Sequence, residues 1–275
     1  MKKIGLALKP NHPQGEGTRK KLAAWLKEQN KEVFFINPPD QNAGPLPSLD
    51  LIIVLGGDGT LLSVARLFGE MNIPILGVNL GSLGFLTEIT LDELYPDLEK
   101  ILKDEFLHDP RLTLQSFIQR KEEQYPQPTV LNDITIHKGA LSNLIKLRIT
   151  INDQFVTSLR ADGLIISSPT GSTAYSLSSG GPIVHPSVDA IVLTPISPHT
   201  LTNRPIVVPS SAKINVALKE HEKGPVVMLD GQDVFPLEGE DVVHIEAGRQ
   251  RIKLIRSPHR NYYQVLRQKL KWGDN

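Results

Sequence analysis

The sequence predicts an α/β domain with a parallel sheet at the N-terminus, followed by a β-rich domain. Apolar strand-like runs alternate with segments of helical spacing up to residue 102. From residue 111 onward, β-type runs separated by turn residues replace that alternation. We therefore expect an α/β domain at 1–110, a β-rich domain at 111–257, and a C-terminal helix at 258–275 that returns to the first domain.

Each element of the first domain follows from its apolar pattern. Short apolar runs predict strands at 4–8, 32–36 and 51–55, and another in the segment that begins at 74. Apolar positions at helical spacing predict helices at 18–29, from Leu61 onward, and at 91–102, the last with an acidic first turn. Because repeated strand–turn–helix units form parallel strands, ligands are expected where the strands end.

The second domain is predicted to consist mainly of strands. The expected strands are 112–119, 129–137, 144–151, 164–167, 190–193, 213–218, 226–229, 242–247 and 252–255. A final helix is expected at 261–271, with Tyr262, Val265, Leu266 and Leu270 on one side.

Composition excludes several classes of function. The 275 residues include 30 basic and 30 acidic side chains, so no net charge favours nucleic acid or an anionic membrane. The chain has no cysteine, which excludes disulfides and thiol catalysis. No signal peptide and no apolar run long enough to span a bilayer is visible. We expect a cytoplasmic protein without membrane or nucleic-acid partners.

A lone carboxylate lies in a glycine turn directly after the strand at 51–55. The turn is Gly56-Gly57-Asp58-Gly59-Thr60, and a helix begins just beyond it. Glycines allow close approach of a ligand to the backbone, and a helix N-terminus favours phosphate. Asp58 then accepts a proton from an attacking hydroxyl or helps to hold a divalent cation. The alternative is a turn or N-cap residue.

A second glycine-rich strand exit spans 74–85 and is expected to flank the same ligand. Neither the GxGxxG dinucleotide fingerprint after a first strand nor the GxxxxGK[ST] phosphate loop occurs in the chain. A standard Rossmann or P-loop protein is therefore disfavoured.

The most unusual stretch of the β-rich region is 160–182, in which small hydroxyl residues and glycine dominate. Such a segment offers backbone N–H groups and hydroxyls to sugar or phosphate oxygens, and Tyr175 offers a ring for a base. A flexible loop or a capped helix is the alternative. The chain has no GxSxG elbow, which disfavours a hydrolase.

Two shorter motifs accompany this stretch. Asn132-Asp133 interrupts an apolar run, as a hydrogen-bonding pair for a ribose or an adenine edge, or as an Asx turn. For Asp230-Gly231 a hairpin turn is preferred, while Gln232 is retained as a candidate ligand contact.

Together these motifs resemble the NAD kinase family over essentially the whole chain. The glycine turn at 56–60 alone is moderately specific, because diacylglycerol kinases, sphingosine kinases and phosphofructokinases carry related turns. The segment 162–182 is highly specific. Further matches are the turn at 77–86, 131–133, 230–232 and the C-terminal 266–273.

The resemblance implies an NAD kinase that uses ATP and a divalent cation, Mg²⁺ for preference, to phosphorylate the 2′-hydroxyl of the adenosine ribose of NAD. It also implies an NAD site between the two domains, with 111–257 as the NAD-binding and oligomerisation domain of a dimer or tetramer whose subunits share sites. Asp58 is the implied proton acceptor, with metal contact through the donor phosphates as a further role. The implied substrate-binding residues are Gly56, Gly57, Gly59, Thr60, Phe85, Asn132, Asp133, Asn143, Arg160, Asp162, Thr170, Thr173, Ala174, Tyr175, Ser176, Leu177, Ser178 and Gln232.

Arg160 and Asp162 match positions on the nicotinamide side that a neighbouring subunit supplies, with Gln232 near them. One departure is visible, because the family usually has Asn-Glu where this chain has Asn132-Asp133. A lipid kinase sharing the glycine turn and a non-catalytic dinucleotide-binding regulator are the competing functions.

Overall fold

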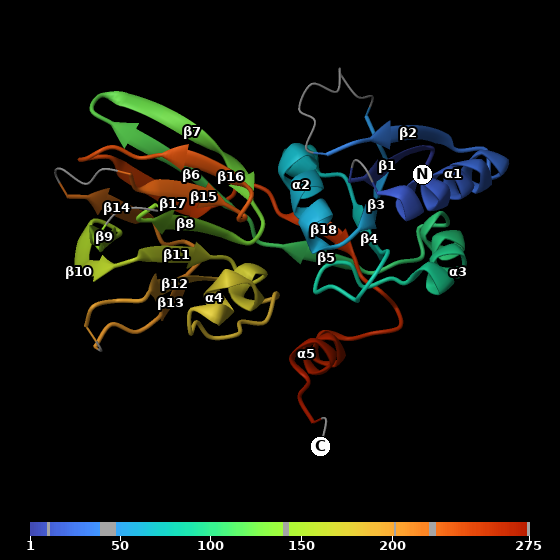
Figure 1. Ribbon diagram of the computed structural model, residues 1–275. Coiled ribbons are helices and arrows are strands. Elements are labelled where there is room, and N and C mark those ends of the chain that lie inside the picture. Colours follow the sequence, from blue (N-terminus) through green and yellow to red (C-terminus); the bar gives the residue numbers. More distant parts are fainter. Residues whose placement is uncertain (10–11, 39–47, 140–142, 201, 220–223, 274–275) are drawn as a thin grey trace. The chain divides into compact units, whose positions relative to one another are not determined.

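The computed structural model describes residues 1–9, 12–38, 48–139, 143–200, 202–219 and 224–273 (Figure 1). The chain divides into two compact units. The first unit comprises Met1–Pro110 and Ile252–Asn275, and the second comprises Arg111–Arg251. In the part of the chain that the structure describes, no helix is long and apolar enough to cross a membrane.

The first unit is built on a six-stranded sheet, sheet A, in the order β2-β1-β3-β4-β18-β5. Its strands are β1 (Lys3–Leu8), β2 (Glu32–Ile36), β3 (Leu51–Gly56), β4 (Ile75–Asn79), β5 (His108–Arg111) and β18 (Ile252–Ile255). Strands β2, β1, β3, β4 and β18 pair in parallel. Because β3 and β4 are neighbours, the two glycine-rich turns that follow them lie at the same edge of the sheet.

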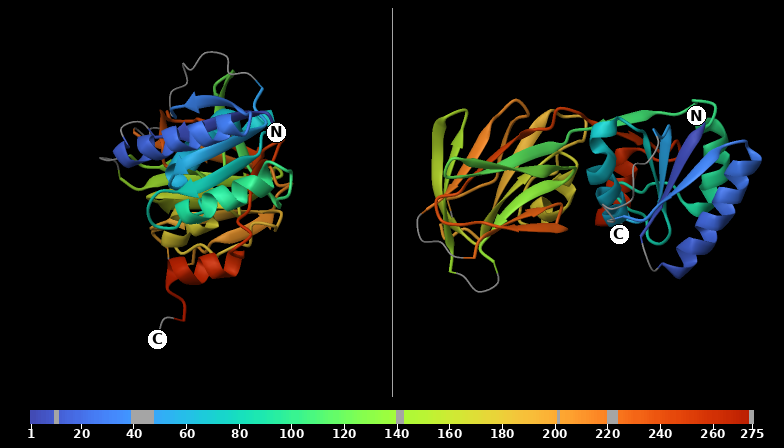
Figure 2. Two further views of the ribbon diagram at one scale, coloured as in Figure 1. Left: turned by 90° about the vertical axis from the view of Figure 1, so that its right-hand side faces the viewer. Right: turned by 90° about the horizontal axis from the view of Figure 1, so that it is seen from above.

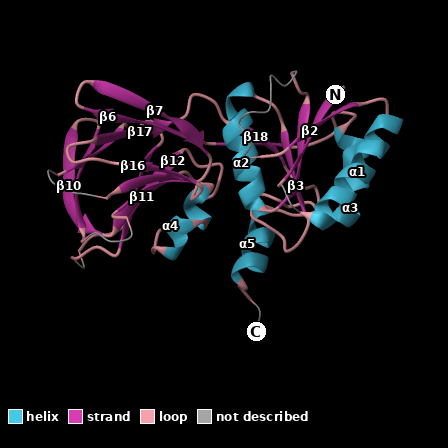
Figure 3. Cartoon of the chain, turned by 45° about the horizontal axis from the view of Figure 1, so that its top comes forward, coloured by secondary structure: helices cyan, strands magenta, loops and turns pink. Residues whose placement is uncertain are grey.

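Helices cover both faces of sheet A (Figure 2). They are α1 (Pro13–Glu28), α2 (Asp58–Phe68) and α3 (Leu91–Ile101), with a short 3₁₀ helix η1 (Gly69–Met71) after α2. The C-terminal helix α5 (Tyr262–Leu270) belongs to the same unit but lies away from the strands (Figure 1). Apolar side chains of α1 and α3 join one core cluster with Leu51, Ile53 and Leu55 of β3. The alternate residues Ile52 and Val54 are also buried, on the face that carries α2 (Figure 3).

Two elements of the first unit differ from the sequence prediction. Residues 252–255, which we expected in the β-rich domain, form a strand that pairs in parallel with β4 of sheet A. A short apolar run does not reveal its partner strand. We had assigned this run to the β-rich domain because it follows the strands of that domain in the sequence. Helix α1 begins at Pro13 rather than at 18, with the His12 side chain accepting the N–H of Gly15 at 3.0 Å. Proline is favourable in a first helical turn.

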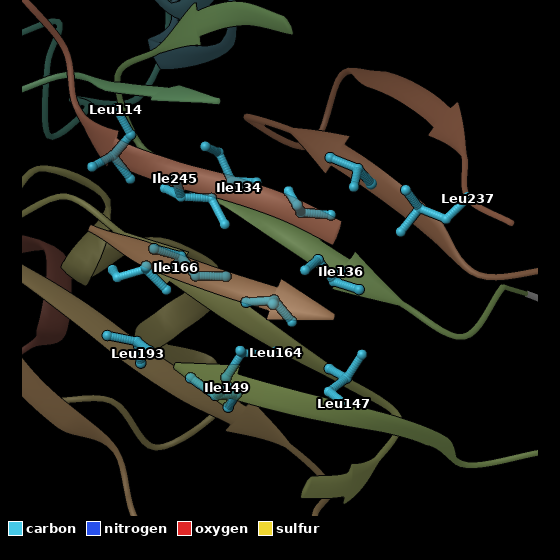
Figure 4. Close-up of a cluster of buried hydrophobic side chains, with 14 of the residues drawn as sticks. Leu114, Ile134, Ile136, Leu147, Ile149, Leu164, Ile166, Leu193, Leu237 and Ile245 are labelled. Carbon is cyan, nitrogen blue, oxygen red and sulfur yellow. The ribbon is translucent and has the colours of Figure 1, made fainter. Parts of the chain in front are cut away.

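The second unit is a sandwich of two antiparallel sheets. Sheet B has the order β10-β9-β14-β17-β6-β7, and sheet C has the order β13-β12-β11-β8-β15-β16. Leu114, Leu147 and Ile245 of sheet B and Ile134, Ile166 and Leu193 of sheet C belong to one buried cluster (Figure 4). The alternation of buried and less buried residues along β6, β9 and β14 is the pattern of strands with one face on a core.

The strands of the second unit are more numerous than the sequence predicts, and β11 and β12 are longer than their predicted counterparts. Their bounds are β6 (Leu114–Arg120), β7 (Glu123–Val130), β8 (Asp133–His137), β9 (Ile145–Ile151), β10 (Gln154–Ala161), β11 (Gly163–Ser167), β12 (Ala190–Ile196), β13 (Ile206–Pro209), β14 (Ile214–Leu218), β15 (Val226–Leu229), β16 (Asp233–Pro236) and β17 (Val242–Ala247). The predicted strand at 129–137 is interrupted at Leu131 and Asn132, where β7 ends and β8 begins.

One end of sheet C collects most of the predicted site segments. Asp133 at the start of β8 pairs with Ser167 at the end of β11, and Leu229 at the end of β15 pairs with Ile134. The hydroxyl-rich segment leaves β11 at this end and forms the short helices η2 (Gly171–Thr173) and α4 (Tyr175–Ser178) (Figure 1). We call this the β8-start end of sheet C.

Candidate functional site

Asp58 joins the two glycine-rich turns of the first unit. Its Oδ2 accepts the N–H of Phe85 at 2.8 Å, and its Oδ1 accepts the N–H groups of Leu86 and Thr87 at 3.0 Å each. The Thr87 hydroxyl adds a bond to Oδ1 at 3.1 Å. Helix α2 has Gly57 as its N-cap, with no side-chain cap, so the alternative interpretation of Asp58 as an N-cap residue is wrong.

The two carboxylate oxygens of Asp58 differ in what they can still accept. Oδ1 has three donors, whereas Oδ2 receives one hydrogen bond from the described residues. A carboxylate oxygen has about two lone-pair sites, so Oδ2 can take a proton or face a cation. The residue is half-buried, with exposed Gly57 and Gly59 on either side. Asp58 is therefore held firmly in place while one oxygen stays available.

The loop that bonds Asp58 is itself organised by Asn79, the last residue of β4. Its side-chain amide donates to the carbonyl of Ser82 at 2.5 Å and to the Thr87 hydroxyl at 3.2 Å, and its Oδ1 accepts the N–H of Gly81 at 2.5 Å. Asn79 is 5% exposed and Thr87 is fully buried. Neither residue is among the predicted site residues, although a polar side chain that ends a buried strand, as Asn79 does, is a usable signal.

Gly84 is required where this loop meets Asp58. A Cβ at this position would overlap Asp58 Oδ1 and Thr87 Oγ1. We expect Gly84→Ala to lower the free energy of unfolding by about 1–3 kcal/mol, the usual cost of overpacking. Urea denaturation measures this change.

The matched control for Gly84→Ala is Gly17→Ala, at an exposed position of α1 where an added Cβ has no neighbour within 4 Å. That change should stabilise the protein by about 0.5–1 kcal/mol, because alanine is the better helix former. Equal stability of Gly84→Ala and the wild-type chain would show that the loop can leave Asp58 at no cost.

The remaining candidates of the first unit frame this turn. Gly56 is buried, and a Cβ there would press on the side chain of Thr60, itself 9% exposed. Phe85 is half-buried, and its ring centroid lies 5.7 Å from the ammonium of Lys269 on α5. The C-terminal helix thus packs beside the loop that bonds Asp58.

In the second unit, Asn132 and Asp133 face different surroundings. Asn132 is half-exposed, whereas Asp133 is 5% exposed and its carboxylate accepts the Thr135 hydroxyl at 3.1 Å. Burial, together with the nearby charge of Asp230, raises the pKa of Asp133 to about 7, against the lowering effect of the Thr135 hydrogen bond. The structure therefore presents the Asn132 amide more openly than the Asp133 carboxyl.

Hydrogen bonds to backbone carbonyls hold the segment around Asn132 against the hydroxyl-rich stretch. Ser168 donates from its hydroxyl to the carbonyl of Leu131 at 2.6 Å and from its N–H to the carbonyl of Asn132 at 2.8 Å. Gly171 packs so closely that a Cβ would collide with the Asn132 carbonyl. The two segments that the sequence marked separately are therefore one packed unit.

Several hydroxyls of this stretch point inward rather than toward a ligand. Ser172 donates to the carbonyl of Pro169 at 2.6 Å and accepts the N–H of Val184 at 3.0 Å. Ser176 is fully buried against Thr194, with 2.8 Å between their hydroxyls. Thr170 is 6% exposed and accepts a hydrogen bond from Arg111 at 3.3 Å. These groups stabilise the fold of the segment.

The exposed side of the same stretch carries the other candidates. Tyr175 is 40% exposed, Ser178 is exposed, and the half-exposed residues are Thr173, Ala174 and Leu177. They lie in η2, in α4 and at the junction between these helices. This surface follows β11 directly, on the β8-start end of sheet C.

Arg160 and Asp162 lie at the other end of β11. Asp162 precedes Gly163, whereas Ser167, five residues further along at the far end of β11, pairs with Asp133, a separation of about 17 Å at the usual rise of a strand. Asp162 forms an ion pair with Lys138 at 2.8 Å, and Arg160 is exposed on β10. Asn143 is also exposed, close before β9.

We had expected Gln232 to lie near Arg160 and Asp162. Within one chain, the structure places it elsewhere. It is exposed in the β15–β16 turn, whose Asp230 donates its N–H to the Asp133 carbonyl at 3.0 Å. Gln232 therefore lies at the β8-start end of sheet C. The sequence could not show this, because the register of β15 against β8 decides it.

A carboxylate in a glycine turn of a parallel-sheet unit, followed by a β-sandwich unit with a hydroxyl-rich exposed segment, defines a two-unit nucleotide kinase. Two family models match the chain, the ATP-NAD kinase N-terminal domain at residues 46–106 and the ATP-NAD kinase C-terminal domain at residues 131–257. The chain belongs to the NAD kinase family.

Relatives agree over the full length. The chain is 47% identical to the NAD kinase of Geobacter sulfurreducens and 45% identical to that of Syntrophotalea carbinolica, with 100% of each chain covered. Among solved structures, yeast NADH kinase complexed with NADH matches with a TM-score of 0.90 at 26% identity, covering 100% of this chain and 89% of that one. An Archaeoglobus fulgidus NAD kinase in complex with ATP matches with a TM-score of 0.78 at 26% identity, covering 98% of each chain.

Proposed function

We propose that this protein transfers the terminal phosphoryl group of ATP to the 2′-hydroxyl of the adenosine ribose of NAD, giving NADP and ADP. The observation that carries the proposal is Asp58, a half-exposed carboxylate at the N-terminus of α2, held rigidly by a second loop with one oxygen available. Full-length similarity to NAD kinases supplies the identity of the substrates.

Asp58 is proposed to accept the proton of the attacking hydroxyl. Phosphoryl transfer needs mainly alignment, charge neutralisation and a group that receives this proton. The bonds from Phe85, Leu86 and Thr87 fix the direction of the carboxylate, so little orientation has to be established during the reaction. Exposed Gly57 and Gly59 leave the backbone beside it open to phosphate oxygens.

Mg²⁺ is proposed to arrive with the phosphates of ATP. No group of three or more metal-ligating side chains occurs among the described residues, which fits a cation held mostly by phosphates and water. Asp58 is the chain's own ligand candidate, because its Oδ2 has spare acceptor capacity. The cation would neutralise the charge that develops on the phosphoryl oxygens.

The second unit is proposed to bind NAD. Asn132 offers its half-exposed amide to the adenosine, and the surface of Thr173, Ala174, Tyr175 and Ser178 lines the dinucleotide. Ser176 and Thr170 support this surface from inside through their buried hydrogen bonds. We propose that Leu177 and Gln232 contribute at its margins. Asn143 lies just before Ile145, which pairs with Ala161 beside Arg160 and Asp162, so any contact of Asn143 belongs to that end.

A direct assay tests the proposal. NADP formation from NAD and ATP is measured with and without magnesium. In a parallel reaction diacylglycerol replaces NAD as the acceptor, and its phosphorylation is measured. Phosphorylation of NAD that requires magnesium supports the proposed function. Phosphorylation of diacylglycerol alone, or NAD binding without turnover, would identify a lipid kinase or a non-catalytic regulator instead.

We propose further that the protein is a homo-oligomer in which Arg160 and Asp162 complete the site of a neighbouring subunit. Their placement one strand length away from Asp133 supports a separate role from the Asn132 segment. Mixing inactive Asp58→Asn subunits with inactive Asp162→Ala subunits should restore activity to about one quarter of the wild-type level in a dimer. Random pairing makes about half of the dimers mixed, and each mixed dimer has one intact site of two.

The control for subunit mixing is an Asp58→Asn chain combined with an Asp58→Asn/Asp162→Ala chain, which contains no intact site and should stay inactive. Activity is followed after dissociation and reassociation of the subunits. If the complementary mixture stays as inactive as this control, the shared site is rejected.

A further inference from the structure

The turn between β15 and β16 contains a buried carboxylate that bonds a distant segment. Asp230 is 8% exposed and has φ 49°. Its Oδ2 accepts the N–H of Leu131 at 3.2 Å, and its Oδ1 accepts the N–H groups of Asn132 at 2.8 Å and of Asp133 at 3.2 Å. A hairpin turn alone requires the backbone conformation of Asp230 but none of these bonds.

Asp230 completes the backbone partners of residues 131–133. Ser168 bonds the carbonyls of Leu131 and Asn132, and the N–H of Asp230 bonds the carbonyl of Asp133 at 3.0 Å. Every N–H and carbonyl of the three residues therefore has a hydrogen-bond partner, which is either Asp230 or Ser168. Leu131 and Asn132 lie between β7 and β8 but are fully hydrogen-bonded, and the half-exposed side chain of Asn132 projects from this fixed backbone.

We propose that Asp230 is a positioning residue that holds the Asn132–Asp133 turn in the conformation that binds the nucleotide. The proposal rests on the proposed function, in which this turn contacts the adenosine of NAD. Three N–H groups directed at one carboxylate form charge-assisted hydrogen bonds, which are stronger than neutral ones. An alanine at position 230 would leave these three donors without their acceptor in a mostly buried place.

Asp230 also acts on Asp133 through its charge. Burial raises the pKa of Asp133 to about 7, with the negative charge of Asp230 as the second cause and the Thr135 hydroxyl acting in the opposite direction. Ser167 lies opposite Asp133 on β11 and carries no charge. Among the described residues, Asp230 is thus the charged group that faces Asp133. Its loss should therefore lower the pKa of Asp133.

The test uses two variants of Asp230 in the full chain. Asp230→Ala removes every side-chain acceptor, whereas Asp230→Asn retains one oxygen and tolerates a positive φ but loses the charge. We expect Asp230→Ala to weaken NAD binding by about tenfold or more and to speed hydrogen exchange at the amides of Leu131, Asn132 and Asp133. We expect Asp230→Asn to shift the titration midpoint of the Asp133 carboxyl, followed by carbon NMR, downward by about half a pH unit or more.

The matched control is Asp153→Asn, another aspartate at positive φ in a hairpin turn, at 62°, but exposed. It should change neither NAD affinity nor the Asp133 titration. Wild-type exchange rates at the three amides in Asp230→Ala would overturn the proposal that Asp230 holds residues 131–133. An unshifted Asp133 midpoint in Asp230→Asn would overturn the charge interaction between the two carboxyl groups. Faster exchange with unchanged NAD affinity would overturn the role in substrate positioning.

The exchange and titration measurements need no substrate, so they test the contacts of Asp230 with residues 131–133 even if the proposed function fails. Failure of the wild-type chain to bind NAD would reject the proposed function and the substrate part of this proposal together. If Asp230→Ala does not fold, amide exchange and NAD affinity are measured in Asp230→Asn, whose side chain keeps a single acceptor oxygen for the three N–H groups.

Discussion

Replacing Asp58 with asparagine is expected to lower kcat by about 100-fold or more while NAD affinity changes little, the range for loss of a positioned acid–base group. The amide cannot accept the proton of the attacking hydroxyl. It can still accept the N–H groups of Leu86 and Thr87 through one oxygen, so most of the contact with the loop survives. Steady-state kinetics and an NAD titration measure the two quantities.

A second variant separates proton acceptance from loop holding. Thr87→Val removes the hydroxyl that bonds Asp58 Oδ1 and Asn79 but keeps the shape of a fully buried side chain. Its kcat should fall much less than that of Asp58→Asn. Equal losses in both variants would mean that Asp58 acts only by holding the loop. A magnesium requirement that rises in Asp58→Asn would identify the carboxylate as a metal ligand as well.

The fold could be predicted from sequence wherever strands lie inside a sheet. Strands β3, β8 and β11 carry apolar runs because nearly all their residues are buried, on both faces. In strand β15 buried and less buried residues alternate, with one face in the core. The strands without a predicted counterpart in the second unit are β10, β13 and β16, together with most of β7, and all four are sheet edges. Edge strands are partly solvated and accept polar residues and proline, so their sequences resemble loops.

Only part of the candidate site could be predicted, because only some of its residues stand out in the local sequence. Asp58 and the hydroxyl-rich stretch stood out because lone acids in glycine turns and dense hydroxyls are unusual in local sequence. Asp230 acquires its importance from amides that lie 97–99 residues away along the chain. The importance of Asn79 depends on how the loop that follows it folds back onto its side chain. Asp230-Gly231 is also a sound hairpin turn, so the local pattern concealed its second role.

Asp133, where the resemblance to the family predicts glutamate, leads to the other large effect. Asp133→Ala is expected to raise the KM for NAD and lower kcat, with kcat/KM falling about ten- to a hundredfold, because a charged hydrogen bond contributes roughly 1.5–3 kcal/mol. We propose that this carboxylate holds the ribose diol, one of the contacts that the Asn132-Asp133 pair predicts, and this diol includes the attacking hydroxyl. Because Asp133 is only 5% exposed, a longer side chain would reach further out, so Asp133→Glu should retain far more activity than Asp133→Ala.

Stability measurements distinguish this role from a purely structural one. The folded-state pKa of Asp133 is raised to about 7, so its favourable contribution to stability is present at low pH and is lost as pH rises through 7. At pH 8 the buried carboxylate is ionised, and its removal relieves a desolvation cost that offsets the lost contact with Thr135. We therefore expect Asp133→Ala at pH 8 to keep a Tm near that of the wild type while kcat/KM falls. A lowered Tm with unchanged kcat/KM would instead make Asp133 a residue that only shapes the start of β8.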